Sequence, residues 1–195
     1  MPCNLVGKVM GKKIIQPSKL LNVSYPFKCW ILADQGMLKL GNKVDHYNDR
    51  TAYISNRKIY DDDRYIWTIN YTSKGFTIQN FSSSGGFLFT GSPVDKDGDR
   101  TVYGHNNGSI DNSKGDRCYF NILEGEFTDN GNVNNDAVLI QTYDPDSYFN
   151  QDSNHEPWTM KWGAYTDHDS DHQVYMQPPG PFRQDRSQFY IQLCG

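Results

Sequence analysis

Short apolar runs separated by turn residues dominate the hydrophobic pattern of this chain. Residues 75–80 alternate apolar and polar side chains with a period of two, as a half-buried β-strand does. Serine and glycine at 82–86 predict a turn, and the apolar residues 87–89 predict the start of the next strand. Further strands are predicted at 101–103 and 118–122. The pattern therefore predicts an all-β protein.

An internal repeat organises these strands. Residues 36–53 align without a gap with residues 86–103 at an offset of 50, and nine of the eighteen positions are identical. A more divergent third copy lies at 158–175, so the spacing G-x3-D-x3-D-x3-Y occurs three times. Each copy is followed by an aromatic-x-aliphatic signal, which is Trp67-Thr-Ile69, Phe120-Asn-Ile122 or Phe189-Tyr-Ile191. A recurring motif of this length indicates a recurring supersecondary unit.

The repeat predicts the organisation of the whole chain. We expect a single domain over 1–195, with an N-terminal arm or first strand at 1–26 and three units at about 27–69, 70–122 and 123–195. Three units of four short strands give twelve strands, and this arrangement resembles a β-trefoil, built from three four-stranded repeats with pseudo-threefold symmetry.

Composition and charge narrow the possible partners. Aromatic residues make up 14% of the chain and can supply a core although aliphatic residues are few. The net charge is −4 and no run of lysine or arginine occurs, which argues against nucleic acid and anionic membranes as partners. No apolar stretch has the length of a transmembrane helix, so no membrane insertion is expected.

The cysteines and sequons bear on the compartment. Cys3, Cys29, Cys118 and Cys194 are far apart and lack metal-ligand spacing. A Cys3–Cys194 disulfide with a Cys29–Cys118 disulfide is one of three possible pairings, and four reduced cysteines are the alternative. Four N-glycosylation sequons favour a secreted, extracellular protein, although the first residues lack the apolar segment of a signal peptide.

The repeated loop V-D-x-x-x-D-R is the best candidate for a binding site. Carboxylates beside an arginine can hydrogen-bond to vicinal sugar hydroxyls while an aromatic ring stacks on the apolar face of the sugar. Trp158 and Tyr165 flank the third loop and could be exposed, whereas Trp162 is expected in the core. The predicted ligand-binding residues are Asp45, Asp49, Arg50, Asp95, Asp99, Arg100, Asp167, Asp171, His172, Trp158 and Tyr165.

A structural role explains the same pattern. Aspartate in a tight loop caps its own backbone as an Asx-turn, and an Asp–Arg pair can brace a hairpin. Residues 95–99 resemble a calcium loop but no bidentate glutamate follows, and the histidines of 167–172 need not converge on a transition metal. No metal, cofactor or catalytic residue is predicted, because no nucleophile elbow, HExxH motif, P-loop or paired-carboxylate signature occurs.

The repeat resembles the β-trefoil of the ricin B-like superfamily. The run F-T-I-Q-N-x-x-S-x-G-x-F-L-F at 76–89 looks like the first hairpin of such a unit. Residues 38–53 and 88–103 are also similar to the C-terminal trefoil of the insect 30-kDa haemolymph lipoproteins. The resemblance implies carbohydrate binding. The Q-x-W signature of ricin is absent, because the three corresponding glutamine positions hold Tyr65, Cys118 and Ser187.

The predicted function is therefore non-enzymatic, lectin-like binding of glycans or a glycoprotein. One alternative is a protein-binding module, such as a protease inhibitor, toxin or defence factor. It would act through the Asn- and Asp-rich stretches 128–136 and 143–157, which lengthen the third unit. The other is a haemolymph storage or lipid-associated protein, in which the repeats serve only the scaffold.

Overall fold

The structure is a computed structural model, and its described residues exclude several connecting segments. They are residues 15, 17–82, 85–106, 109–110, 116–124, 136–143, 156–179 and 186–194. Most of the predicted loops at 128–136 and 143–157 lies outside these residues, and so does Cys3.

The described residues form twelve β-strands and short 3-10 helices, which confirms the prediction of an all-β protein. None of these helices is long and apolar enough to cross a membrane. The 3-10 helices η1 and η2 span Pro17–Asn22 and Asp63–Tyr65. The strands are β1 Phe27–Ala33, β2 Gly36–Leu40, β3 Asp49–Ser55, β4 Ile66–Thr72, β5 Gly75–Asn80, β6 Leu88–Thr90, β7 Arg100–His105, β8 Phe120–Glu124, β9 Val138–Thr142, β10 Thr159–Thr166, β11 Asp171–Gln177 and β12 Tyr190–Leu193.

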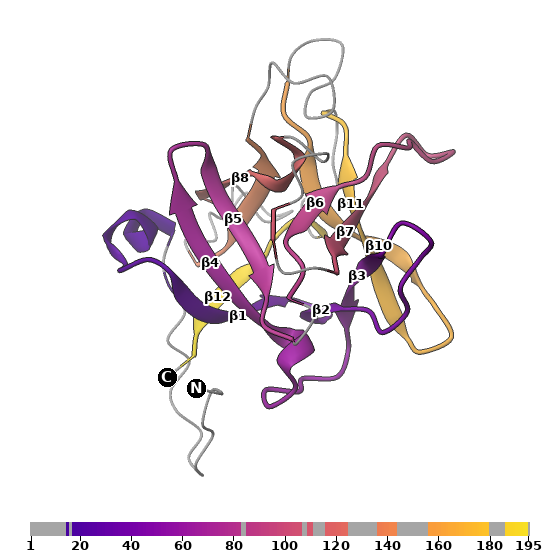
Figure 1. The fold of residues 1–195 in the computed structure, drawn as a ribbon, viewed down its shortest axis with the longest axis horizontal. Helices are drawn as coiled ribbons and strands as arrows, with labels where there is room; N and C mark the ends of the chain where they lie inside the picture. The colour runs from indigo at the N-terminus through magenta and orange to yellow at the C-terminus, as the bar shows by residue number, and fades with distance from the viewer. Residues whose placement is uncertain are drawn as a thin grey trace, which may run out of the picture.

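The strands form one continuous sheet that closes on itself (Figure 1). The order is β10-β9-β8-β5-β4-β1-β2-β3-β11-β7-β6, and β12 pairs with β1. Additional pairings of β10 with β11 and of β3 with β7 close the sheet. Closure leaves few strand edges with unpaired backbone groups.

The predicted β-trefoil of three four-stranded repeats with pseudo-threefold symmetry is therefore wrong as a description of this sheet, which is a closed β-barrel. The predicted unit boundaries at 69/70 and 122/123 fall inside β4 and β8. Across these boundaries β4 pairs with β5 at three positions and β8 pairs with β9 at three. Backbone hydrogen bonds thus join neighbouring units, because a strand left unpaired at a boundary would expose its polar groups.

Strand β5 matches its predicted bounds but not its predicted exposure. The period-two pattern of Gly75–Asn80 predicts one solvated face, yet only Gln79 in this strand is not fully buried. In the sheet β5 lies between β4 and β8, and Phe87 bridges to Gln79 from the next segment. Both faces of β5 are therefore largely buried.

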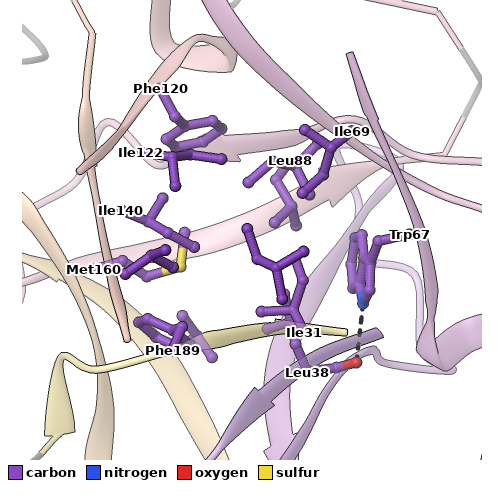
Figure 2. Packing of buried hydrophobic residues seen from close by; sticks show 14 of the residues in the cluster. Ile31, Leu38, Trp67, Ile69, Leu88, Phe120, Ile122, Ile140, Met160 and Phe189 are labelled. Carbon is purple, nitrogen blue, oxygen red and sulfur yellow. Dashed lines mark hydrogen bonds between the residues drawn. The ribbon is translucent and has the colours of Figure 1, made fainter. Parts of the chain in front are cut away.

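The core lies inside the barrel and draws on nearly every strand (Figure 2). The three closing aromatics, Trp67, Phe120 and Phe189, are each 0% exposed, as the recurring signal predicts. Trp67 keeps its indole N–H satisfied by donating to the Leu38 carbonyl at 2.9 Å. The aromatic-x-aliphatic signal therefore marks residues that fill the barrel interior.

The structure tests one of the two predicted disulfides. Cys29 and Cys118 are both buried and neither is disulfide-bonded, so a Cys29–Cys118 bridge does not form. Burial raises the pKa of the Cys29 thiol, which keeps it protonated and unreactive. The pairing of Cys3 with Cys194 stays a prediction, because Cys3 lies outside the described residues.

Candidate functional site

The three copies of the repeated loop connect β2 to β3, β6 to β7 and β10 to β11. Figure 1 shows these hairpins on the side of the molecule away from η1. The first aspartate of each loop organises the loop backbone. Its Oδ1 accepts two backbone N–H groups at 2.8 to 3.0 Å, from Tyr47 and Asp49 to Asp45, from Asp97 and Asp99 to Asp95, and from Asp169 and Asp171 to Asp167. This is the Asx-turn of the structural alternative.

A residue with positive φ completes each loop. Asn48, Gly98 and Ser170 have φ values of 65°, 83° and 62°. Each donates its backbone N–H to the carbonyl of the first aspartate of its loop at 3.1 Å. Asparagine and glycine tolerate this left-handed conformation well, and the aspartate hydrogen bonds hold the serine in it. The loops therefore share one backbone design.

The second aspartate of each loop is buried and paired with a base from a neighbouring hairpin. Asp49, Asp99 and Asp171 are only 5%, 7% and 4% exposed. Their partners are His105 at 2.6 Å, Lys161 at 2.7 Å and Lys39, respectively. Burial raises the pKa of Asp99 although the charge and hydrogen bond of Lys161 oppose the shift. These aspartates brace the hairpins against one another.

Two of the residues at the arginine position of the repeat contact backbone carbonyl groups. Arg100 donates to the carbonyl of Gly91 at 3.4 Å and to that of Ser92, and its guanidinium lies 4.7 Å from the Trp158 ring. His172 lies 2.8 Å from the Gly163 carbonyl. Arg50 is half-buried. Trp158 is 5% exposed, which contradicts its predicted exposure, because Arg100 covers the ring.

The glycine and tyrosine of the repeat pack against each other. A Cβ on Gly41, Gly91 or Gly163 would lie 3.0, 2.8 or 3.1 Å from a ring carbon of Tyr53, Tyr103 or Tyr175. Only glycine lets the ring approach the opposite strand this closely. The four most regular residues of the repeat thus have structural partners.

A cleft of about 370 Å³ nevertheless opens between the first and third of these loops. We call it the loop cleft. Its lining combines the floor residues Lys39, Tyr53 and Asp171 with residues of both loops and with Arg64. The lining residues are Lys39, Gly41, Asn42, Lys43, Val44, Asp45, Asp49, Thr51, Tyr53, Arg64, Asp167, His168, Asp169 and Asp171.

The structure brings four of the predicted site residues together in this cleft: Asp45, Asp49, Asp167 and Asp171. The others do not line it. Tyr165 is 91% exposed beside the third loop, whereas Trp162 is 3% exposed and belongs to the core, as predicted. The equivalent residues of the second loop, Asp95 and Asp99, lie elsewhere on the barrel.

The charges at the floor of the cleft are internally balanced, and those at its rim are not. Lys39 neutralises Asp171, and Asp62 neutralises Arg64, which also donates to Asn42. The pKa of Tyr53 is raised by burial and then by the nearby carboxylates of Asp167 and Asp171, although a hydrogen bond from Thr51 opposes the shift. The cleft therefore has a fixed floor and a mildly negative rim.

Sequence reasoning missed the basic and neutral side of the cleft. Asn42 and Lys43 lie inside the repeat but differ between its copies, so a search for shared residues passes over them. Arg64 lies in the Asp-rich run 61–64, and its partner Asp62 caps η2 by accepting the Arg64 backbone N–H at 2.9 Å. An aspartate at a helix N-cap is recognisable in a sequence, so this pattern could have indicated the position of Arg64.

The third loop contains a cluster of possible metal ligands. One ligand atom from each of Asp167, His168 and Asp169 lies within 4.8 Å of the others, and all three residues are exposed. Asp167 Oδ1 already accepts two backbone N–H groups. The transition-metal site considered at residues 167–172 also needed His172, but that ring contacts the Gly163 carbonyl. The geometry therefore gives no further argument for a metal.

The comparisons with known proteins concern the fold. No family model and no curated protein matches the chain. Among solved structures, a Culex quinquefasciatus salivary protein of the Cysteine and Tryptophan-Rich family matches with a TM-score of 0.60 and 13% identity, over 96% of this chain and 100% of that one. A Caenorhabditis elegans protein of unknown function matches with a TM-score of 0.60 and 8% identity, over 89% of this chain and 97% of that one.

A lectin is also among the matches. The Macrolepiota procera ricin B-like lectin, solved in complex with lactose, gives a TM-score of 0.54 and 16% identity, over 87% of this chain and 96% of that one. At these identities the likeness shows the fold alone. It gives no support to the resemblance to haemolymph lipoproteins.

Proposed function

We propose that this protein is a non-enzymatic carbohydrate-binding protein and that the sugar lies in the loop cleft. The observation that carries the proposal is the mixed lining of the cleft. Lys43 and Asn42 offer donors on one loop, while Asp167 and Asp169 offer acceptors on the facing loop. A sugar hydroxyl both donates and accepts, so facing donors and acceptors suit vicinal hydroxyls.

The fixed floor supports the same proposal. The buried ion pair of Lys39 and Asp171 joins the first and third hairpins without using the rim carboxylates. The volume of about 370 Å³ is within the range of small-molecule sites. The likeness in fold to a lectin solved with lactose favours a glycan ligand, and the likeness to a salivary protein makes an extracellular glycoprotein a reasonable partner.

A glycan array followed by titration with the best glycan tests the proposal. The double variant Asp167→Asn/Asp169→Asn should weaken binding about tenfold or more, because charge-assisted hydrogen bonds are lost. The asparagine introduced in place of Asp167 keeps an Oδ1 acceptor, so the Asx-turn survives.

The repeat offers a matched control for this experiment. Asp95→Asn/Asp97→Asn makes the same two changes at the equivalent positions of the second loop, outside the cleft. It should leave the affinity unchanged. Equal losses in the two double variants would place the sugar elsewhere, and an array without hits on folded protein would count against carbohydrate binding altogether.

A further inference from the structure

An arginine recurs in all three units of the chain, three residues before each closing aromatic. The shared pattern is Arg-x-x-aromatic-x-Ile, and it occurs at 64–69, 117–122 and 186–191. The spacing between the repeated loop and the closing aromatic differs in the second unit, but the spacing within this pattern does not. The arginine therefore belongs to the recurring unit, as the closing aromatic does.

In two of the units this arginine has a scaffold role. Arg117 Nη1 donates to the Thr90 carbonyl and Arg186 Nη1 donates to the Trp162 carbonyl, both at 3.3 Å. Thr90 and Trp162 occupy the same position of the repeat, which is Leu40 in the first copy. Each of these two arginines thus ties the segment before a closing strand to the equivalent strand of its own unit.

The arginine of the first unit has a different partner. Arg64 Nη1 donates to a side chain, the Oδ1 atom of Asn42. Both residues line the loop cleft, and of the three arginines Arg64 is the one that does so. The residues equivalent to Asn42 are Ser92 and Ala164, which carry no amide group. The contact is therefore specific to the first unit and lies at the proposed sugar site.

Arg64 is held rigidly from both its backbone and its side chain. Its backbone N–H donates to Asp62 Oδ1 at 2.9 Å, and its carbonyl accepts from Asn80 Nδ2 at 2.8 Å. Its Nε atom lies 3.1 Å from each carboxylate oxygen of Asp62, and its Nη2 atom donates to Oδ2 at 2.5 Å. The next residue, Tyr65, is 1% exposed and anchors η2. Because the guanidinium is planar, these contacts also fix the direction of Nη1.

A fixed guanidinium determines which end of the Asn42 amide a ligand meets. Guanidinium groups only donate, so Asn42 turns its Oδ1 atom toward Arg64 and keeps Nδ2 for a ligand. A sugar hydroxyl bonds equally well to either end of an amide, so a fixed donor favours a group that only accepts. The ring oxygen only accepts too, but every sugar has one.

The charges of the cleft narrow the choice of acceptor. A ligand carboxylate only accepts, but it would meet the like charges of Asp45, Asp167 and Asp169, which also line the cleft. A neutral carbonyl group avoids this repulsion. In sugars that group is the carbonyl of an N-acetyl substituent.

We propose that Arg64 is a positioning residue that fixes Asn42 as a donor, and that the loop cleft selects an N-acetylated amino sugar. The acetamido carbonyl accepts from Asn42 Nδ2 and from Lys43. The acetamido N–H points the opposite way in a trans amide and donates to the carboxylates of Asp167 and Asp169 on the facing loop. This inference rests on the proposed carbohydrate binding and names its ligand class.

The side-chain amide of Asn42 tests the positioning role without any sugar. In ¹⁵N-labelled protein its heteronuclear NOE should be as high as that of the backbone, and Arg64→Met should lower it to the value of a mobile side chain. Arg64→Lys should give an intermediate value, because an ammonium group lacks the planar fork that spans both partners. Arg186→Met changes the equivalent arginine outside the cleft and should leave the Asn42 amide unchanged. An Asn42 amide that is equally mobile in the wild-type, Arg64→Lys and Arg64→Met proteins would overturn the role.

Sugar titrations test the ligand class. We expect N-acetyl-D-glucosamine or N-acetyl-D-galactosamine to bind about tenfold or more tightly than D-glucose or D-galactose, respectively. Arg64→Met should remove this preference and Arg64→Lys should restore part of it, whereas a merely structural role would weaken all four sugars alike. Asn42→Asp keeps an acceptor for Arg64 but loses the donor, so it should also remove the preference.

The outcomes separate this inference from the proposed function. Equal affinities for the acetylated and parent sugars would show that Asn42 meets a hydroxyl or ring oxygen, and the ligand class would be wrong. If neither acetylated sugar binds while the glycan array finds other ligands, the ligand class fails and carbohydrate binding stands. An array without hits removes both the function and the ligand class, and the NOE of the Asn42 amide then still decides whether Arg64 fixes it.

Discussion

The β6–β7 hairpin contacts a neighbouring hairpin on each of its two sides, and we call each such contact a junction. A buried aspartate of the repeat lies at both junctions, but its basic partner differs. Where this hairpin meets β10, the buried Asp99 pairs with Lys161 at 2.7 Å. Where it meets the β2–β3 hairpin, the buried Asp49 pairs with His105 at 2.6 Å. The strand position that carries Lys161 in the third copy carries Phe89 in the second, and Phe89 is buried and stacks on Tyr103 at a centroid distance of 5.7 Å.

The difference shows what the barrel requires at a junction. The constant feature is a buried carboxylate with a base beside it, while the identity and the strand of the base vary. At the remaining junction the base is again a lysine, because Asp171 pairs with Lys39. Retention of the second aspartate in all three copies therefore follows from the scaffold and does not by itself indicate a ligand.

The largest effect should come from removing the base at the lysine junction. Lys161→Met leaves Asp99 buried without its partner, which should lower the free energy of unfolding by about 3 kcal/mol. Urea unfolding measures this loss. The double variant Lys161→Met/Asp99→Asn should recover a large part of it, because no buried charge remains.

An exposed lysine provides the control. Lys43 lies at the rim of the loop cleft and is exposed. Lys43→Met should change stability by less than about 0.5 kcal/mol. If Lys161→Met and Lys43→Met destabilise equally, the junction ion pair contributes nothing and the comparison of junctions fails.

A smaller effect should separate the hairpins by how tightly their glycines pack. A Cβ on Gly91 would lie 2.8 Å from the Tyr103 ring and 2.9 Å from the Thr101 carbonyl oxygen. On Gly163 the nearest atoms are 3.1 Å away on Tyr175 and 3.4 Å away on Gln173. Thermal unfolding should therefore show a loss of about 2 kcal/mol for Gly91→Ala and about 1 kcal/mol for Gly163→Ala. The reverse order would contradict this account of the repeat.

Features that depend on neighbours in sequence could be predicted. The Asx-turn at Asp95 needs only the N–H groups two and four residues later, and the closing aromatic Phe120 is recognised by its apolar neighbours. The strand at 75–80 follows from its composition. These predictions hold because the interactions that determine them lie within a few residues.

Features that depend on which hairpins meet could not be predicted. The Lys39–Asp171 pair joins strands from opposite ends of the chain, and the loop cleft exists only because the first and third loops face each other. The sequence predicts an exposed Trp158, but in the structure Arg100 of the second hairpin covers its ring. The strand pairings of the sheet could not be predicted either, because the repeat reveals recurring sequence and not the pairings that cross its boundaries.

The smallest expected effect is a difference in pH dependence between a junction carboxylate and a surface one. Burial raises the pKa of Asp99 above its ordinary value of 3.8, so folded protein holds this proton more tightly than unfolded protein. The stability that Asp99 contributes should therefore fall as the pH rises from 3.8 through its folded pKa. At Asp62 burial acts in the same direction, but the hydrogen bonds and charge of Arg64 outweigh it, so its pKa lies below 3.8.

The contribution of Asp62 is consequently present above pH 3.8 and lost as the pH falls through its folded pKa. Urea unfolding at several values from about pH 3 to pH 7 measures both effects against the isosteric variants. The stability difference between the wild-type protein and Asp99→Asn should decrease with pH over this range, while the difference from Asp62→Asn should increase. Slopes of the same sign would show that Lys161 stabilises the Asp99 carboxylate more than burial destabilises it, which would make the two sites electrostatically alike.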